Sequence, residues 1–217
     1  MPEAKNTLFK NSAFTLIELL IAMAISSIMM AVIATAYWVQ AQISREQQMV
    51  VEMQQNLRSA MYFLERDIMM AGYDDDRNNL PEGRIIAANA VQFTFEFVDD
   101  ANAVVRIAYS LFDALNDGDA DLGRSVNGVA PQAVAENLQT LEFFYTMANG
   151  TRTLNPANLQ DIRVVGISLL ARTASETRAV DRRTYTSLSG ATTGPFNNRF
   201  QRQLVTAMIR CRNMIGD

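Results

Sequence analysis

The chain has 217 residues, of which 49% are hydrophobic, and it carries a formal net charge of −4. This length allows one ordinary domain with an additional anchor, the composition excludes a disordered chain or a multi-span membrane protein, and the acidic balance gives no indication of a nucleic acid partner. With no histidine and a single cysteine, the chain cannot form a Ser-His-Asp or Cys-His site or an internal disulfide, so we do not expect an enzyme.

The N-terminal segment combines a short basic leader with a long apolar run. Both lysines, Lys5 and Lys10, precede this run, and residues 19–39 carry no charge. At about 1.5 Å per residue, a helix of this length crosses a bilayer core of about 30 Å. The lysines favour a cytoplasmic N-terminus with the rest of the chain exported. The segment therefore predicts a single-pass anchor.

Three interpretations of this segment differ in where the chain is cleaved. A plain anchor explains the length of the run but not the residues before it. A cleaved secretory signal is supported by the A-x-A sequence at residues 34–36, which would give a chain that starts at Tyr37. Against that signal, the run before the A-x-A sequence is longer than most signal cores, and Glu18 lies at its start. The third interpretation rests on residues 12–20.

The sequence Ser-Ala-Phe-Thr-Leu-Ile-Glu-Leu-Leu at residues 12–20 resembles the prepilin cleavage and methylation motif of type IV pilins and type II secretion pseudopilins. The resemblance implies that a prepilin peptidase cuts after Ala13 and methylates the new N-terminal residue, Phe14. The family usually has glycine before the cut, where this chain has Ala13. Alanine is the next smallest residue, so we expect cleavage to survive, at a reduced rate.

Two interpretations of Glu18 stay open. A carboxylate inside an apolar helix costs about 2.5–3.5 kcal/mol at the middle of the bilayer, so it should find a partner. The family resemblance implies that Glu18 neutralises the amine of Phe14 on a neighbouring subunit and so sets the register of the filament. The alternative is a boundary carboxylate that lies among the lipid headgroups.

The helix is predicted to continue beyond the membrane. No glycine or proline occurs between Phe14 and Ala71, and Gly72 is a plausible C-cap. After Val39 the segment becomes amphipathic, because apolar residues recur at steps of three and four positions. These residues are Val50, Met53, Leu57, Met61, Leu64 and Ile68.

Beyond Pro81 the pattern changes to strict alternation, which predicts strands. The candidates are Phe93–Phe97, Val105–Leu111, Leu141–Tyr145, Val165–Ala171, Thr184–Thr186 and Leu204–Ile209. We therefore predict an α+β fold in which the back half of a long N-terminal helix packs against a C-terminal antiparallel sheet. The predicted organisation is a leader at 1–13, a transmembrane or filament-core helix at 14–39, its amphipathic continuation at 40–72, and a β-rich periplasmic domain at 73–217.

Three further stretches are similar to PilW-type minor pilins. They are residues 66–73, residues 136–139 and residues 199–204, the last of which leads to Arg212 and Asn213. The second stretch is expected just before a strand. The resemblance implies a minor pilin that helps to initiate and assemble a type IV pilus. Its implied partners are other minor and major pilins, the prepilin peptidase, the inner-membrane assembly platform and, before assembly, the lipid bilayer. A type II secretion minor pseudopilin is the near alternative, and a membrane-tethered periplasmic binding protein or enzyme is a third possibility.

An acidic loop at residues 113–121 suggests a calcium site. Alternating acids around Gly118 supply hard oxygen ligands, and the candidate ligands are Asp113, Asp117, Asp119 and Asp121. A calcium-loop register that starts at Asp113 places Gly118 correctly, but it then puts Leu115 and Arg124 where ligands belong. A solvated Asp/Asn/Gly turn is the alternative interpretation. Cys211 is expected to be a small buried hydrophobe rather than a reactive thiol.

Overall fold

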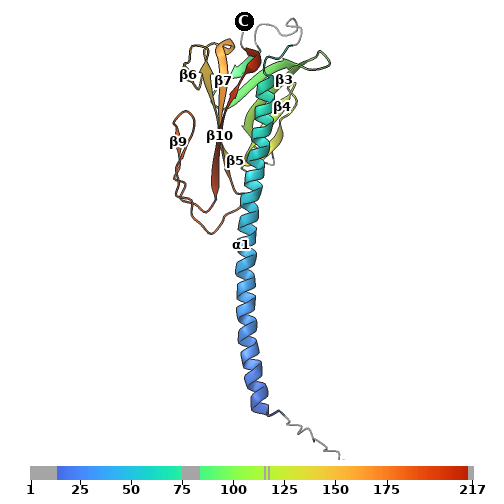
Figure 1. The fold of residues 1–217 in the computed structure, drawn as a ribbon, viewed down its shortest axis with the longest axis vertical. Helices are drawn as coiled ribbons and strands as arrows, with labels where there is room; N and C mark the ends of the chain where they lie inside the picture. Colours follow the sequence, from blue (N-terminus) through green and yellow to red (C-terminus); the bar gives the residue numbers. More distant parts are fainter. Residues whose placement is uncertain (1–13, 75–83, 115, 117, 215–217) are drawn as a thin grey trace, which may run out of the picture. The chain divides into compact units, whose positions relative to one another are not determined.

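The computed structural model describes residues 14–74, 84–114, 116 and 118–214. Contacts divide the chain into two compact units, Met1–Glu46 and Gln47–Asp217. Helix α1 extends over Leu16–Met70, so it supplies the helical part of the first unit and one element of the second (Figure 1). The uninterrupted helix predicted from the absence of glycine and proline is confirmed.

The C-terminal end of α1 depends on Gly72. This residue adopts φ +74°, a left-handed conformation that glycine reaches without steric cost, and the Tyr73 N–H donates to the carbonyl of Met70 at 2.8 Å. A Cβ at this position would lie 2.8 Å from Cδ of Arg84 and 2.9 Å from Sδ of Met214. The predicted C-cap glycine is therefore confirmed, because its left-handed conformation favours glycine, and a side chain there would also displace Arg84 and Met214.

The second unit contains an eight-stranded antiparallel sheet in the order β1-β2-β3-β4-β5-β7-β10, with β6 paired to β5. Its strands are β1 (Ile85–Ala88), β2 (Gln92–Val98), β3 (Val104–Phe112), β4 (Ala120–Val126), β5 (Gln132–Met147), β6 (Arg152–Thr153), β7 (Ile162–Arg172) and β10 (Arg202–Arg210). A separate two-stranded hairpin is formed by β8 (Tyr185–Thr186) and β9 (Thr192–Thr193). Short 3₁₀ turns occupy Leu159–Asp161 and Arg212–Met214.

One face of the sheet packs against the part of α1 that belongs to this unit. The apolar stripe of the helix, represented by Leu57, Leu64 and Ile68, shares a continuous core with alternate residues of the strands. The largest of these strand side chains, all fully buried, are Phe93, Phe95, Tyr109, Phe143, Tyr145 and Ile107. Burying such apolar area is the dominant favourable contribution to folding. The predicted α+β fold is confirmed.

The opposite face of the sheet is partly covered by the connection between β7 and β10, which carries the β8–β9 hairpin. The hydroxyls of Ser187 and Ser189 donate to the carboxylate of Glu142 on β5 at 3.0 and 2.8 Å, and the Leu188 N–H donates to Oγ of Ser168 at 3.0 Å. A Cβ at position 166 would lie 3.0 Å from Cδ1 of Leu188, so Gly166 makes room for this contact. The hairpin is therefore fastened by hydrogen bonds rather than by a second core.

Several strands were missed or misplaced by the alternation pattern. Strands β1, β4, β6 and β9 were not predicted, and β5 begins at Gln132, so residues 136–139 lie inside a strand rather than before one. For β4 and β5 the reason is a local irregularity, because Asn137 adopts φ +58° where the register between these two strands shifts. Such a bulge interrupts the alternation and hides the strand from a period-two search.

Candidate functional site

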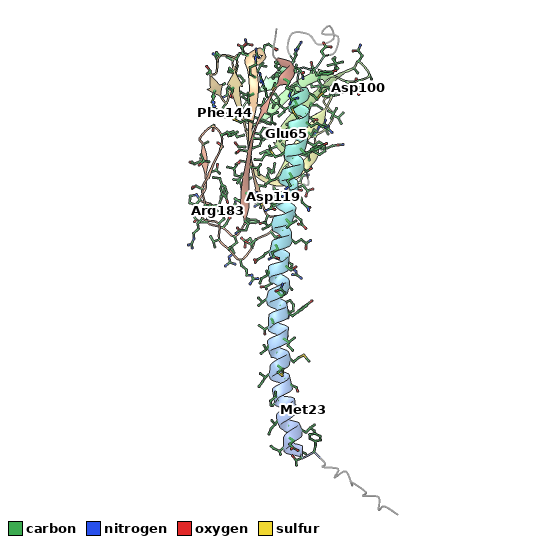
Figure 2. The ribbon with its side chains drawn as sticks, viewed as in Figure 1. Met23, Glu65, Asp100, Asp119, Phe144 and Arg183 are labelled. Atoms are coloured by element: carbon green, nitrogen blue, oxygen red, sulfur yellow. The ribbon has the colours of Figure 1, made fainter. Side chains whose placement is uncertain are left out.

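The front half of α1 presents an extended apolar surface. Every residue from 14 to 40 is exposed, and within the described residues α1 is a helix long and apolar enough to cross a membrane. Figure 2 shows the side chain of Met23 among those that project from this part of the helix. Soluble proteins rarely expose contiguous apolar patches beyond a few hundred Å². This surface must therefore be covered by lipid or by other apolar helices.

The helix begins in a capping box formed by Thr15 and Glu18. The Thr15 backbone N–H and the Thr15 hydroxyl both donate to Oε2 of Glu18 at 2.9 Å, and the Glu18 N–H donates to Oγ1 of Thr15 at 3.3 Å. This arrangement satisfies backbone donors that have no partner inside the helix. The carboxylate of Glu18, which the motif places in an apolar segment, thus caps the helix. Its hydrogen bonds to Thr15 hold it at the start of α1.

The predicted processing site lies at the boundary of the described residues. Ala13 falls outside them, whereas Phe14 is 87% exposed and precedes the first helical residue by two positions. The residue that would become the N-terminus is therefore sterically accessible within this chain. Its N-methylation stays a prediction.

A buried charged cluster joins α1 to the sheet. Asp67 is only 4% exposed, and its Oδ2 accepts hydrogen bonds from the Tyr109 hydroxyl at 2.8 Å and from Nε of Arg124 at 2.6 Å. Arg66 donates to the other oxygen at 3.2 Å. Burial first, then the charge of Asp67, raises the pKa of Tyr109 well above its ordinary value, so the phenol stays a neutral donor. Burial alone would lower the pKa of Arg124, but the hydrogen bond and charge of Asp67 raise it.

Sequence reasoning did not assign this cluster a function, although one signal was present. Asp67 follows Leu64 by three positions and Ala60 by seven, so it lies on the same face of α1 as the apolar stripe. A carboxylate on a buried face requires partners. Its partners, Tyr109 and Arg124, are 42 and 57 positions away in the sequence, beyond the reach of any local pattern.

The acidic loop is held by hydrogen bonds from the protein itself. Asp121 is 4% exposed and accepts backbone N–H bonds from Ala114 at 3.1 Å and from Asn137 at 3.2 Å. Asp119 forms an ion pair with Arg172. Asp113 accepts a bond from the Gly118 N–H at 3.0 Å, and Asp117 lies outside the described residues. Among the residues that the structure describes, no group of three or more acidic, histidine or cysteine side chains is arranged to hold a metal ion.

Calcium binding at this loop stays a prediction, and thermal unfolding tests it. A ligand that binds only the folded chain raises stability by about 2.7 kcal/mol at a hundredfold excess over Kd. We would compare the full chain in detergent micelles, with millimolar calcium and then with a chelator. A calcium site predicts a higher melting temperature that Asp119→Ala abolishes and that magnesium reproduces poorly. Equal melting temperatures would identify a hydrogen-bonded turn.

A second buried ion pair secures the connection between β7 and β10. Asp181 and Arg202 are each 3% exposed and lie 3.4 Å apart, and the Tyr185 hydroxyl donates to Asp181 at 2.8 Å. Burial alone would raise the pKa of Asp181, but hydrogen bonds from Tyr185 and Arg183 hold it below its ordinary value. The guanidinium of Arg202 also stacks on the ring of Phe196, 3.8 Å from its centroid. These contacts organise a segment that has little regular secondary structure.

Cys211 is fully buried at the end of β10, as predicted for a small hydrophobe. Burial raises the pKa of its thiol to about 12, so the reactive thiolate is scarce at neutral pH.

Comparisons with known families agree with this arrangement at both ends of the chain. The model of the prokaryotic N-terminal methylation motif matches residues 8–34, and that of the type IV pilus-assembly protein W matches residues 68–213, more than half of the chain. The chain belongs to the type IV pilus-assembly protein W family. Among solved structures, a type IV-like pilin from Thermus thermophilus has a TM-score of 0.52 at 16% identity, covering 74% of this chain and 97% of that one. At that identity the similarity shows the fold alone, and no curated protein sequence matches.

Membership of the protein W family places the chain among structural components of type IV pilus assembly rather than among enzymes. The methylation motif implies processing by a prepilin peptidase and assembly with pilus components. A prepilin with an N-terminal hydrophobic helix is consistent with a location in the inner membrane, followed by the pilus.

Proposed function

We propose that this member of the protein W family is a minor pilin that contributes to the initiation and assembly of a type IV pilus. It packs the front half of α1 against the helices of sibling minor and major pilins. The observation that carries this proposal is the exposed apolar surface of residues 14–40, in which Glu18 is the single charged residue. Lipid covers this surface before assembly, and neighbouring helices replace the lipid in the filament.

The geometry of Glu18 suits a contact between subunits. Both Thr15 donors bind Oε2, whereas Oε1 accepts no hydrogen bond from the described residues. Cleavage after Ala13 would create a cationic amine at Phe14, whose reference pKa is about 7.7–8.0. The free oxygen can then accept the amine of a sibling subunit while the capping box keeps the carboxylate in position. In a low dielectric medium this attraction is far stronger than in water.

A type II secretion pseudopilin would share the leader, the motif and the helix. The match of residues 68–213 to the pilus-assembly protein W model favours the pilus instead. On this proposal the chain spans the inner membrane before assembly, with its leader in the cytoplasm and its C-terminal domain exported. In that membrane it also contacts the inner-membrane assembly platform.

Peptide mapping of the mature N-terminus tests the proposal. The full chain, isolated from membranes and from sheared pili of a piliated strain, is expected to begin at N-methylated Phe14, because the motif directs cleavage after Ala13. Ala13→Gly is the matched control, which should give the same N-terminus with faster processing. A mature chain that begins at Tyr37 would instead indicate an ordinary secretory signal. Such a chain would lack Glu18 and most of the apolar surface, and it would contradict the filament function.

A further inference from the structure

Strand β10 forms an unusually open edge of the sheet. Among the strands that the structure describes it pairs with β7 alone, without a register shift, and it extends over nine residues, whereas β1 at the other edge has four. Proteins usually protect edge strands with charges, prolines, bulges or short length. Residues 204–208 of β10, Leu-Val-Thr-Ala-Met, carry none of these features. This stretch is therefore prepared to pair with another strand.

The alternation of hydrogen-bonded positions along β10 shows which of its backbone groups point away from β7. The Thr173 N–H donates to Gln201 and the Cys211 N–H donates to Arg163, so the odd-numbered positions of β10 direct their backbone groups at β7. The backbone groups of Leu204, Thr206 and Met208 then point away from the sheet. Thr206 and Met208 are exposed, and among the described residues the only strand paired with them is β7, which lies on their other side.

A groove lies beside this edge, between β10 and α1. It has a volume of about 430 Å³, and its lining includes Leu57, Met61, Gln203 and Val205 together with the charged residues Arg58 and Glu65. Tyr62, also in its lining, is 61% exposed. A strand added to β10 would direct alternate side chains into this groove, since successive residues of a strand point to opposite faces.

The charges at the groove specify the chemistry of such a strand. Arg58 and Glu65 are exposed, and neither has an ion-pair partner among the residues that the structure describes (Figure 2 labels Glu65 on α1). They lie seven positions, or about 10.5 Å, apart on the helix. A complementary strand would carry an acidic residue near Arg58, a basic residue near Glu65 and apolar residues between them on the same face.

We infer that the outer edge of β10, together with this groove, binds an extended strand from the globular domain of a sibling pilin. The added strand continues the sheet through backbone hydrogen bonds with the outward groups at Leu204, Thr206 and Met208. Its alternate side chains enter the groove, which supplies specificity. This inference rests on the proposed function, because it assumes that sibling pilins pack beside this chain.

Site-specific crosslinking in living cells tests the inference. A benzophenone amino acid replaces Met208 at the edge, Val129 at an exposed turn distant from the edge in the sheet order, or Met23 on the front half of α1. The full chain is produced with its sibling minor pilins, and mass spectrometry identifies the crosslinked peptides. The probe at Met208 is expected to capture a strand of a sibling domain, and the probe at Val129 is not.

Thr206→Pro and Thr206→Ala form the matched pair. Proline removes an outward N–H that β7 does not use, so we expect an unchanged melting temperature and about a tenfold lower yield at Met208, the scale of one lost hydrogen bond. Alanine keeps the N–H and should leave the yield unchanged. An unchanged yield with proline, or capture of a second copy of this chain or of a helix, would overturn the inference. Crosslinks at Met23 without any at Met208 would also overturn the inference, but they would leave the proposed function intact. The absence of crosslinks at both positions would contradict the proposed function itself.

Discussion

Replacing Asp67 with alanine is expected to lower the free energy of unfolding of the Gln47–Asp217 unit by about 3–5 kcal/mol. The substitution leaves the guanidinium of Arg124, only 21% exposed, and the fully buried hydroxyl of Tyr109 without their acceptor. An uncompensated buried charge is costly because it cannot recover its hydration. Chemical unfolding of the full chain in detergent micelles, followed by near-ultraviolet circular dichroism, measures the change.

Three variants separate the ion pair from simple side-chain loss. Glu65→Ala removes an exposed acid from the same helix and is expected to change stability by less than about 0.5 kcal/mol. Tyr109→Phe removes one donor and should cost about 1 kcal/mol. Combining Asp67→Leu, Arg124→Met and Tyr109→Phe should recover much of the loss, because an apolar replacement leaves no unpaired charge. If Asp67→Ala cost no more than Glu65→Ala, the cluster would not fasten α1 to the sheet.

Removing the charge of Glu18 is expected to abolish assembly while leaving membrane insertion intact. Insertion should survive because the segment becomes more apolar. Association with sibling pilins should fall by at least about a hundredfold, since breaking a buried ion pair costs about 3–5 kcal/mol. Co-purification from membranes and counts of surface pili, in a strain whose own copy of the gene is deleted, measure the two effects.

The capping box makes Glu18→Gln the informative partner of Glu18→Ala. Glutamine can accept the same hydrogen bonds from Thr15, so it preserves the capping box while removing the charge. If the ion pair with a sibling amine matters, both variants should fail equally. Normal piliation with glutamine and failure with alanine would show that Glu18 acts only in starting the helix. Normal assembly with both would leave Glu18 as a boundary carboxylate.

Much of the fold follows from local patterns. The helix between Thr15 and Gly72 is predictable because its signals lie in the segment itself. The segment contains no helix-breaking glycine or proline, and a glycine follows its C-terminal end. Strands with regular alternation, such as β2 and β7, are predictable for the same reason. Strand β4 is different, because its Gly123 is required by neighbours: a Cβ there would lie 2.7 Å from Phe112 and 2.9 Å from Pro131. Such a strand is specified by what packs around it.

The acidic loop at residues 113–121 shows that local sequence patterns are equally limited in predicting a binding site. Its spacing suggested metal ligands, but the sequence contains no local indication that Arg172 pairs with Asp119 or that the backbone of Asn137 binds Asp121. These partners arrive through the pairing of β4 with β5 and of β5 with β7. A carboxylate's environment therefore depends on strand order, which residue spacing does not reveal.

The sequence by itself indicated the apolar anchor segment, the processing motif and the long amphipathic helix, because each depends on residues within a few positions. Only the tertiary structure decided which residues pair with Asp67 and which strand is left at the open edge. Asp67 meets Tyr109 and Arg124 across 42 and 57 positions, and β10 is the edge because, of the described strands, it pairs with β7 alone. Contacts of that range form when the whole sheet closes over the helix, so no short pattern contains them.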